Sequence, residues 1–192
     1  MKKMILLLFM IAASATSFAQ ISWKSDPMHS RLGFKVTHLG ISDISGAFNK
    51  FNATVSYSKP DMSDAVITLE ADVNSINTAV EMRDNHLKSA DFFDAAQYPK
   101  LTFKSTSIKS AGKDKFKVTG DLSLHGVTKP VTMDMLFRGI GKNPAANNAE
   151  VAGIQVTGTI KRSDFAIGSK FPAPMISDEV WIQADGEFGQ AK

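Results

Sequence analysis

The four histidines of this chain, His29, His38, His86 and His125, are the residues best suited to hold a metal ion or to transfer a proton. No two of them have the i, i+4 spacing of a helical metal site, and the sequence has no His-Glu-x-x-His motif. His29 and His38 are an odd number of positions apart, so on one regular strand they would point to opposite faces. We therefore predict no metal site, and we expect His29 and His125 to fix turns by hydrogen bonding.

Nucleophilic catalysis has little support in the sequence. Ser30 follows His29, but neighbouring side chains at the start of a strand point apart, and no Gly-x-Ser-x-Gly motif occurs. The chain has no cysteine, which excludes a disulfide, a thiolate metal site and a cysteine nucleophile. We predict that the protein is not an enzyme, with no catalytic residues and no cofactor.

Two pairs of charged residues stand close together in the sequence. Arg83 and Asp84 are adjacent on a predicted helix and so do not face each other, whereas Arg162 and Asp164 share the parity of a strand and could flank the opposite strand. These four residues and His86 have two interpretations. They are ion pairs and caps that tie a helical segment to the rest of the fold, or they contact the headgroup of a ligand at a pore mouth.

Most of the chain alternates apolar and polar residues, the period of a β-strand with one wet face. Six segments show this pattern clearly and two show it weakly: 31–38, 65–74, 116–124, 131–137, 152–160 and 180–188, then 51–57 and 101–105. Parallel strands would read as continuous apolar runs and would need helices between them. The sequence therefore predicts an all-β fold, an extended antiparallel eight-stranded barrel that meanders along the chain.

Residues 79–97 interrupt the strand pattern with a helical one. Thr78 and Glu81 have the spacing of a capping box, and Ser89 resembles a second N-cap. The pattern predicts two short helices, a helical insertion that closes one end of the barrel. We favour a fixed plug over a moving lid.

An eight-stranded barrel can be filled by side chains or can hold one small ligand. Its predicted inward positions mix large aromatic residues with alanine, glycine and methionine, so the small residues either leave a tunnel or are filled by the rings. The residues alone leave both open. The predicted pore lining is Phe34, Val36, His38, Phe51, Ile67, Leu69, Phe92, Phe93, Phe103, Leu122, Met133, Met135, Phe137 and Ile154, with His38 or His86 as a polar contact in the mouth.

The first 19 residues have the build of a cleavable secretory signal peptide: two lysines, a short apolar run and a small-residue ending at Ala19. The apolar run is shorter than the ~20 residues of a membrane-spanning helix. We therefore predict a periplasmic protein with one domain at 20–192. A net charge of only +3, without a basic cluster, argues against a nucleic acid as partner.

Ordered motifs along the chain resemble those of the YceI-like family of exported bacterial lipid-binding proteins. They are DPMHS at 26–30, FKVTH at 34–38, GAF at 46–48, RDNHL at 83–87, DFFD at 91–94, YP at 98–99, GDLSLHGVTKPV at 120–131 and KRSDF at 161–165. The resemblance implies a lipocalin-like barrel whose pore holds a polyisoprenoid or a similar long-chain amphiphile, such as a quinone tail or a fatty amide. Ala166 departs from the family, which commonly has glycine there.

Three functions follow as hypotheses. The first is a periplasmic carrier that shields a polyisoprenoid or another long-chain lipid from water, because burial of the chain alone supplies the affinity. The second is an accessory enzyme of quinone or lipid metabolism, and the third is a ligand-free envelope stress or interaction module with a filled barrel. Transient membrane contact, for which Trp181 is a candidate, and a homodimer are further expectations.

Overall fold

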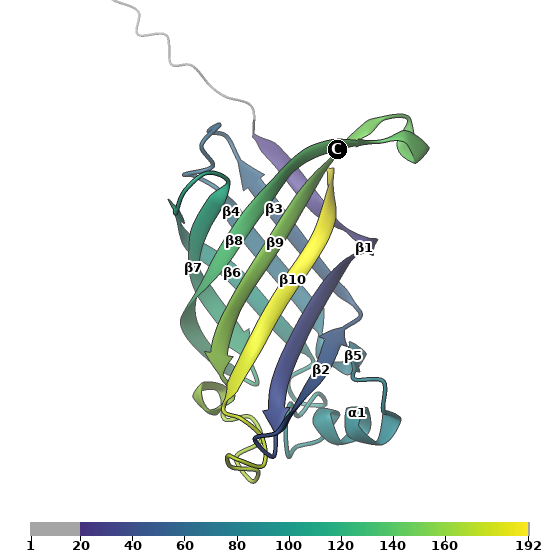
Figure 1. Cartoon of the computed structure of the whole chain (residues 1–192), viewed down its shortest axis with the longest axis vertical. Coiled ribbons are helices and arrows are strands. Elements are labelled where there is room, and N and C mark those ends of the chain that lie inside the picture. The colour runs from purple at the N-terminus through teal and green to yellow at the C-terminus, as the bar shows by residue number, and fades with distance from the viewer. Residues whose placement is uncertain (1–19, 192) are drawn as a thin grey trace, which may run out of the picture.

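The structure, a computed structural model, describes residues 20–191 and consists mainly of one strongly twisted β-sheet (Figure 1). The strands are β1 (Ile21–His38), β2 (Ser42–Phe48), β3 (Phe51–Tyr57), β4 (Val66–Asp72), β5 (Ile76–Asn77), β6 (Lys100–Ser110), β7 (Lys115–Leu124), β8 (Val127–Asn143), β9 (Ala149–Lys161) and β10 (Glu179–Gln190). The helices are α1 (Glu81–Lys88) and the short 3-10 helices η1 (Val73–Ser75), η2 (Pro144–Ala146) and η3 (Arg162–Phe165). The predicted signal peptide lies outside the described residues.

The sheet closes on itself because β10 pairs with β1. β2 and β3 both pair with β1, along its second and first halves, so together they form one wall of the barrel. β4 and β5 follow each other along the next wall in the same way, pairing with β3 and β2. Each of the remaining walls is a single strand antiparallel to its neighbour in sequence. The predicted eight-stranded antiparallel barrel is confirmed.

The two ends of the barrel differ (Figure 1). At one, the terminal end, β1 begins and β10 finishes, and buried residues that include Trp23, Val55, Phe116 and Met135 fill the interior. The other, the helix end, carries α1, the β1–β2 turn and the long 162–178 loop. No helix among residues 20–191 is long and apolar enough to cross a membrane.

The helical insertion contains one α-helix, where the sequence predicts two. α1 begins after Val80, whose apolar side chain cannot cap it, and the Thr78 hydroxyl bonds to Asp84 and Arg83 inside α1 instead. Ser89 ends α1 as its C-cap, and residues 89–97 form turns rather than a second helix. The capping-box and second-helix predictions are therefore wrong. Local sequence spacing allowed both, but Thr78 bonds instead to Arg83 and Asp84 of α1 itself, and the Ser89 hydroxyl donates to the His86 carbonyl.

β1 bulges away from β10 between Ser25 and Ser30, and this segment carries a pH-sensitive pair. His29 Nδ1 lies 2.9 Å from Asp26 Oδ2. Hydrogen bonding to Asp26, and then its charge and that of Glu187, raises the pKa of His29 above its ordinary value of 6.5. The same hydrogen bond lowers the pKa of Asp26 below 3.8. His29 thus fixes this bulge, in line with its predicted role.

We expect an NMR titration of His29 to have its midpoint above 6.5, and the variant Asp26→Asn to bring the midpoint down. Because the folded pKa of His29 is raised, the pair stabilises the fold below pH 6.5 and this contribution disappears as the pH rises through the folded pKa. Glu187→Gln is the matched control and should give a smaller decrease, since Glu187 is the weaker cause. A midpoint that Asp26→Asn leaves unchanged would contradict the assignment.

Candidate functional site

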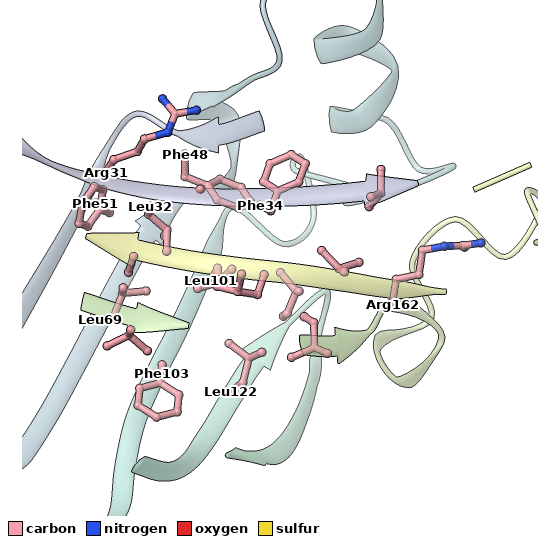
Figure 2. A pocket seen from close by; sticks show the side chains of 18 of the residues that line it. Arg31, Leu32, Phe34, Phe48, Phe51, Leu69, Leu101, Phe103, Leu122 and Arg162 are labelled. Atoms are coloured by element: carbon pink, nitrogen blue, oxygen red, sulfur yellow. The ribbon is translucent and has the colours of Figure 1, made fainter. Parts of the chain in front are cut away.

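An apolar cavity of about 470 Å³ occupies the half of the barrel nearer the helix end (Figure 2). This volume is within the range of ligand pockets in proteins. Inward residues of every strand except the short β5 form its walls, and residues of α1 and of the 162–178 loop surround its mouth. Several of its lining residues, among them His38, His86 and Met175, are exposed at the helix end, where the cavity meets solvent.

Twelve of the fourteen residues predicted to line the pore line this cavity. They are Phe34, Val36, His38, Phe51, Ile67, Leu69, Phe92, Phe93, Phe103, Leu122, Met133 and Ile154. Met135 and Phe137 do not. Met135 is packed in the filled core of the terminal end, with 1% of its surface exposed, and Phe137 lines a separate pocket at that same end. Both have the inward parity of β8, but parity does not reveal the position along the barrel axis.

Two large side chains of the cavity wall lie close against glycines of neighbouring strands. Phe34 extends across Gly46 of the neighbouring strand, and a Cβ added to that glycine would come within 2.3 Å of the ring. Phe103 lies in the same way over Gly120, at 2.4 Å from such a Cβ. The rings therefore occupy the space beside the glycines, which is one of the two alternatives that the sequence left open. The axis of the barrel nevertheless stays open. Figure 2 shows Phe34 and Phe103 on different walls of the pocket.

Sequence reasoning missed part of the lining. Leu32, Phe48, Leu101, Val156, Ile160 and Ile182 lie on the strands, so their alternating pattern could have identified them. Phe171, Met175 and Ile176 belong to the 162–178 loop, which has no periodic pattern. No signal in the sequence showed that this loop covers the mouth.

α1 turns one face toward the cavity. Arg83, His86 and Leu87, at positions i, i+3 and i+4, all line it. The His86 ring meets the rings of Phe92 and Phe171 edge-on, at centroid distances of 5.0 and 5.5 Å. Phe92 and Phe171 stack on each other at 4.9 Å. These aromatic contacts join the segment after α1 to the 162–178 loop beside the mouth.

An ion pair on the surface makes the same connection. Lys170 Nζ lies 2.5 Å from Asp91 Oδ1, and His86 Nε2 lies 3.4 Å from Asp91 Oδ2. The hydrogen bond from Lys170, with a second from His86, holds the pKa of Asp91 below its ordinary value. Since these groups are solvent-exposed, the pair adds little to stability. The arrangement agrees with the plug interpretation of the helical insertion.

Asp84 does not reach the mouth, contrary to the headgroup hypothesis. Its carboxylate is buried and accepts hydrogen bonds from the Thr78 backbone N–H at 2.8 Å and from Thr78 Oγ1 at 2.5 Å. Arg83 donates from Nε to Thr78 Oγ1 at 2.7 Å and from Nη2 to the Thr78 carbonyl at 2.9 Å. Thr78 therefore links the two charges, although adjacent helix positions do not face each other.

Arg162 is buried and uses its whole guanidinium group on backbone carbonyls of the 162–178 loop. The carbonyls belong to Ile167, Gly168, Phe171, Ile176 and Ser177. A guanidinium has five N–H donors, so none remains for a ligand headgroup. Asp164 points to the outside, where it pairs with Lys129 at 2.8 Å. The two residues therefore do not flank the opposite strand, because η3 breaks the strand parity at Arg162.

The remaining histidine, His125, has its ring Nδ1 2.9 Å from the Phe165 carbonyl and thereby joins the β7–β8 turn to η3. Next to this contact, Ala166 adopts a left-handed φ of 55°, a conformation that glycine adopts more readily than other residues. No three His, Asp or Glu side chains in the described part of the chain are grouped as a metal site.

Comparisons with known proteins agree with this geometry. The model of the YceI-like domain matches residues 23–188. A UPF0312 protein of Vibrio parahaemolyticus is 41% identical over 155 residues, which cover 81% of each chain. BcnA of Burkholderia cenocepacia has a similar solved structure, with a TM-score of 0.76, 27% identity, and coverage of 86% of this chain and 99% of that one.

A domain from Saccharophagus degradans, described as polyisoprenoid-binding and implicated in plant cell wall breakdown, shares the fold. Its TM-score is 0.65 at 16% identity, with 91% of this chain and 99% of that chain covered. At this identity the likeness concerns the fold alone. The family model, by contrast, spans nearly all the described residues, and the UPF0312 relative aligns over most of them. The chain belongs to the YceI-like family.

Proposed function

We propose that this protein binds the hydrocarbon chain of a long-chain lipid, of the polyisoprenoid class, inside its barrel. The observation that carries the proposal is the apolar cavity of about 470 Å³, which is bounded by a filled core at one end and meets solvent at the other. The Saccharophagus degradans domain, whose description names polyisoprenoid binding, has the same barrel and supports this class of ligand.

Burial of the chain is sufficient for tight binding. Each methylene removed from water contributes about 0.8 kcal/mol, so a dozen methylenes contribute ~10 kcal/mol before the entropy cost of association. Such a ligand is selected by its length and thickness, because the walls present few polar groups. A filled barrel, the third hypothesis, would have no space for it.

The role that we propose is binding and shielding rather than catalysis. Arg162 at the mouth donates all its hydrogen bonds to the protein, and Thr78 and Asp84 bond to each other. The signal-like segment at 1–19 supports a periplasmic carrier. Leu39, Ile41 and Met175 are large exposed apolar residues at the helix end, and they support transient contact with a membrane during lipid transfer. A homodimer stays a prediction.

The decisive experiment is to purify the protein from the periplasm without detergent, extract it with organic solvent and identify the extracted molecules by mass spectrometry. We expect one long-chain amphiphile at about one molecule per protein. Added quinones and a fluorescent fatty acid serve as a second measurement. A clean extract from a protein that also takes up none of these added ligands would show that the barrel binds no lipid.

A further inference from the structure

The polar groups that line the cavity have an excess of positive charge. They include three arginines, Arg31, Arg83 and Arg162, and one carboxylate, Asp185. Asp185 lies toward the terminal end, in register with Arg31, and forms an ion pair with Arg138 at 3.2 Å. Arg31 and Arg162 lie at opposite ends of the pocket in Figure 2. The mouth at the helix end thus has two cationic lining residues and no carboxylate among the lining residues.

Of these two arginines, only Arg83 has hydrogen-bond donors to offer a ligand. Arg162 uses all five of its N–H groups on loop carbonyls. Within residues 20–191, Arg83 bonds only to Thr78, through Nε and through one N–H of Nη2. Both N–H groups of Nη1 and the second N–H of Nη2 remain, and these form the outer edge of the guanidinium.

The Thr78–Asp84 contact holds this edge in place. Thr78 Oγ1 accepts from Arg83 Nε and donates to the buried carboxylate of Asp84, so the arginine is fixed without being capped by a carboxylate. A held guanidinium with a free edge is suited to two parallel hydrogen bonds with a carboxylate or a phosphate. The apolar walls around it strengthen the attraction to an anion, because a low-dielectric surrounding screens charge less.

We infer that Arg83 is a headgroup site and that the preferred ligands are long-chain lipids with an anionic headgroup. The hydrocarbon chain lies along the barrel, and the carboxylate or phosphate sits at the mouth on the Nη1–Nη2 edge of Arg83. His86, one turn further along α1, borders the same site. This inference rests on the proposed lipid-binding function and adds to it the chemical class of the headgroup.

The test compares two ligands with the same chain and different headgroups. N-phenyl-1-naphthylamine, a neutral fluorescent probe, is bound to the protein and displaced by hexadecanoic acid or by hexadecanol at about pH 8, where the acid is ionised. The wild type should bind the acid on the order of tenfold more tightly than the alcohol. Arg83→Gln should remove this preference, because it should weaken the binding of the acid much more than that of the alcohol. Arg83→Lys should keep part of it, since lysine offers the charge without the two-pronged geometry.

Lys117→Gln is the matched control, because it removes an exposed cation whose partner, Asp134, does not line the cavity either, and it should retain the preference. Equal affinity of the wild type for the acid and the alcohol would overturn the inference and leave lipid binding intact. The inference would also be overturned by an Arg83→Gln variant that keeps the preference, or by one that folds but loses both ligands equally. If neither ligand displaces the probe from the wild type, the proposed function itself fails. Should Arg83→Gln not fold, the wild-type comparison and Arg83→Lys still decide the question.

Discussion

Replacing Ala184 with phenylalanine is expected to weaken the binding of a long-chain lipid by on the order of 100-fold. Ala184 lines the cavity from β10, between Leu32 of β1 and Val156 of β9, which line it too. The new ring would take the space of about four methylenes of the ligand, a loss of ~3 kcal/mol of apolar burial. Titration with a fluorescent long-chain fatty acid measures the effect.

Gln183→Phe provides the matched control for this variant. Gln183 precedes Ala184 on β10 and points to the opposite face of the strand, so its substitution adds the same ring outside the cavity. Its affinity for the fatty acid should stay close to that of the wild type. If Ala184→Phe folds normally and binds as tightly as the wild type, the ligand does not occupy this cavity.

Arg162→Met is expected to lower the free energy of unfolding by about 3 kcal/mol or more. Methionine keeps the long apolar stem but donates no hydrogen bond, so the five carbonyls of the 162–178 loop lose their shared partner. A hydrogen bond to a charged group is worth about 1.5–3 kcal/mol, and water at the loop surface compensates part of the loss. Urea denaturation, with hydrogen exchange of the loop amides, measures the change.

Two further variants define the cause of this loss. Arg162→Lys keeps the positive charge but has three donors instead of five, and it should fall between wild type and Arg162→Met. Arg138→Met removes an exposed arginine that pairs with Asp185, and it should cost less than about 1 kcal/mol. An Arg162→Met protein as stable as the wild type would mean that the loop is held by its aromatic contacts with the segment after α1.

The barrel was predictable because its signals are local. Alternation with a period of two identifies most of the strands, although β2 and β5 were not among the predicted segments. From β6 to β10, neighbouring strands in the sequence are also neighbours in the sheet. The main error in this region concerns the helical insertion. Thr78 had the spacing of an N-cap for α1, but its hydroxyl donates to the Asp84 carboxylate and accepts from Arg83 instead. Spacing reveals which groups can meet, whereas the observed backbone conformation decides which of the several possible local partners is bonded.

The candidate site was predictable in part. Residues such as Phe34, Leu69 and Phe103 were correctly placed on the inner face, because parity determines the face of a strand. Parity gives no height along the barrel axis, and so Met135, in the filled core, had the same pattern as Met133, in the cavity wall. For Arg162 two interpretations were open, an ion pair or a headgroup contact, and neither included the five backbone carbonyls of one irregular loop that it bonds.

The sequence by itself determined the closed antiparallel barrel, its apolar inner face and the family, because these depend on local periodicity and on ordered motifs. The tertiary structure alone decided where the barrel is empty and which polar groups reach the mouth. The volume of a cavity is the space that the eight walls enclose minus the volume of the side chains inside it. This volume depends on how the side chains pack, for example on Phe34 lying over Gly46. The availability of Arg83, in contrast to Arg162, likewise depends on partners that only folding brings within hydrogen-bonding distance.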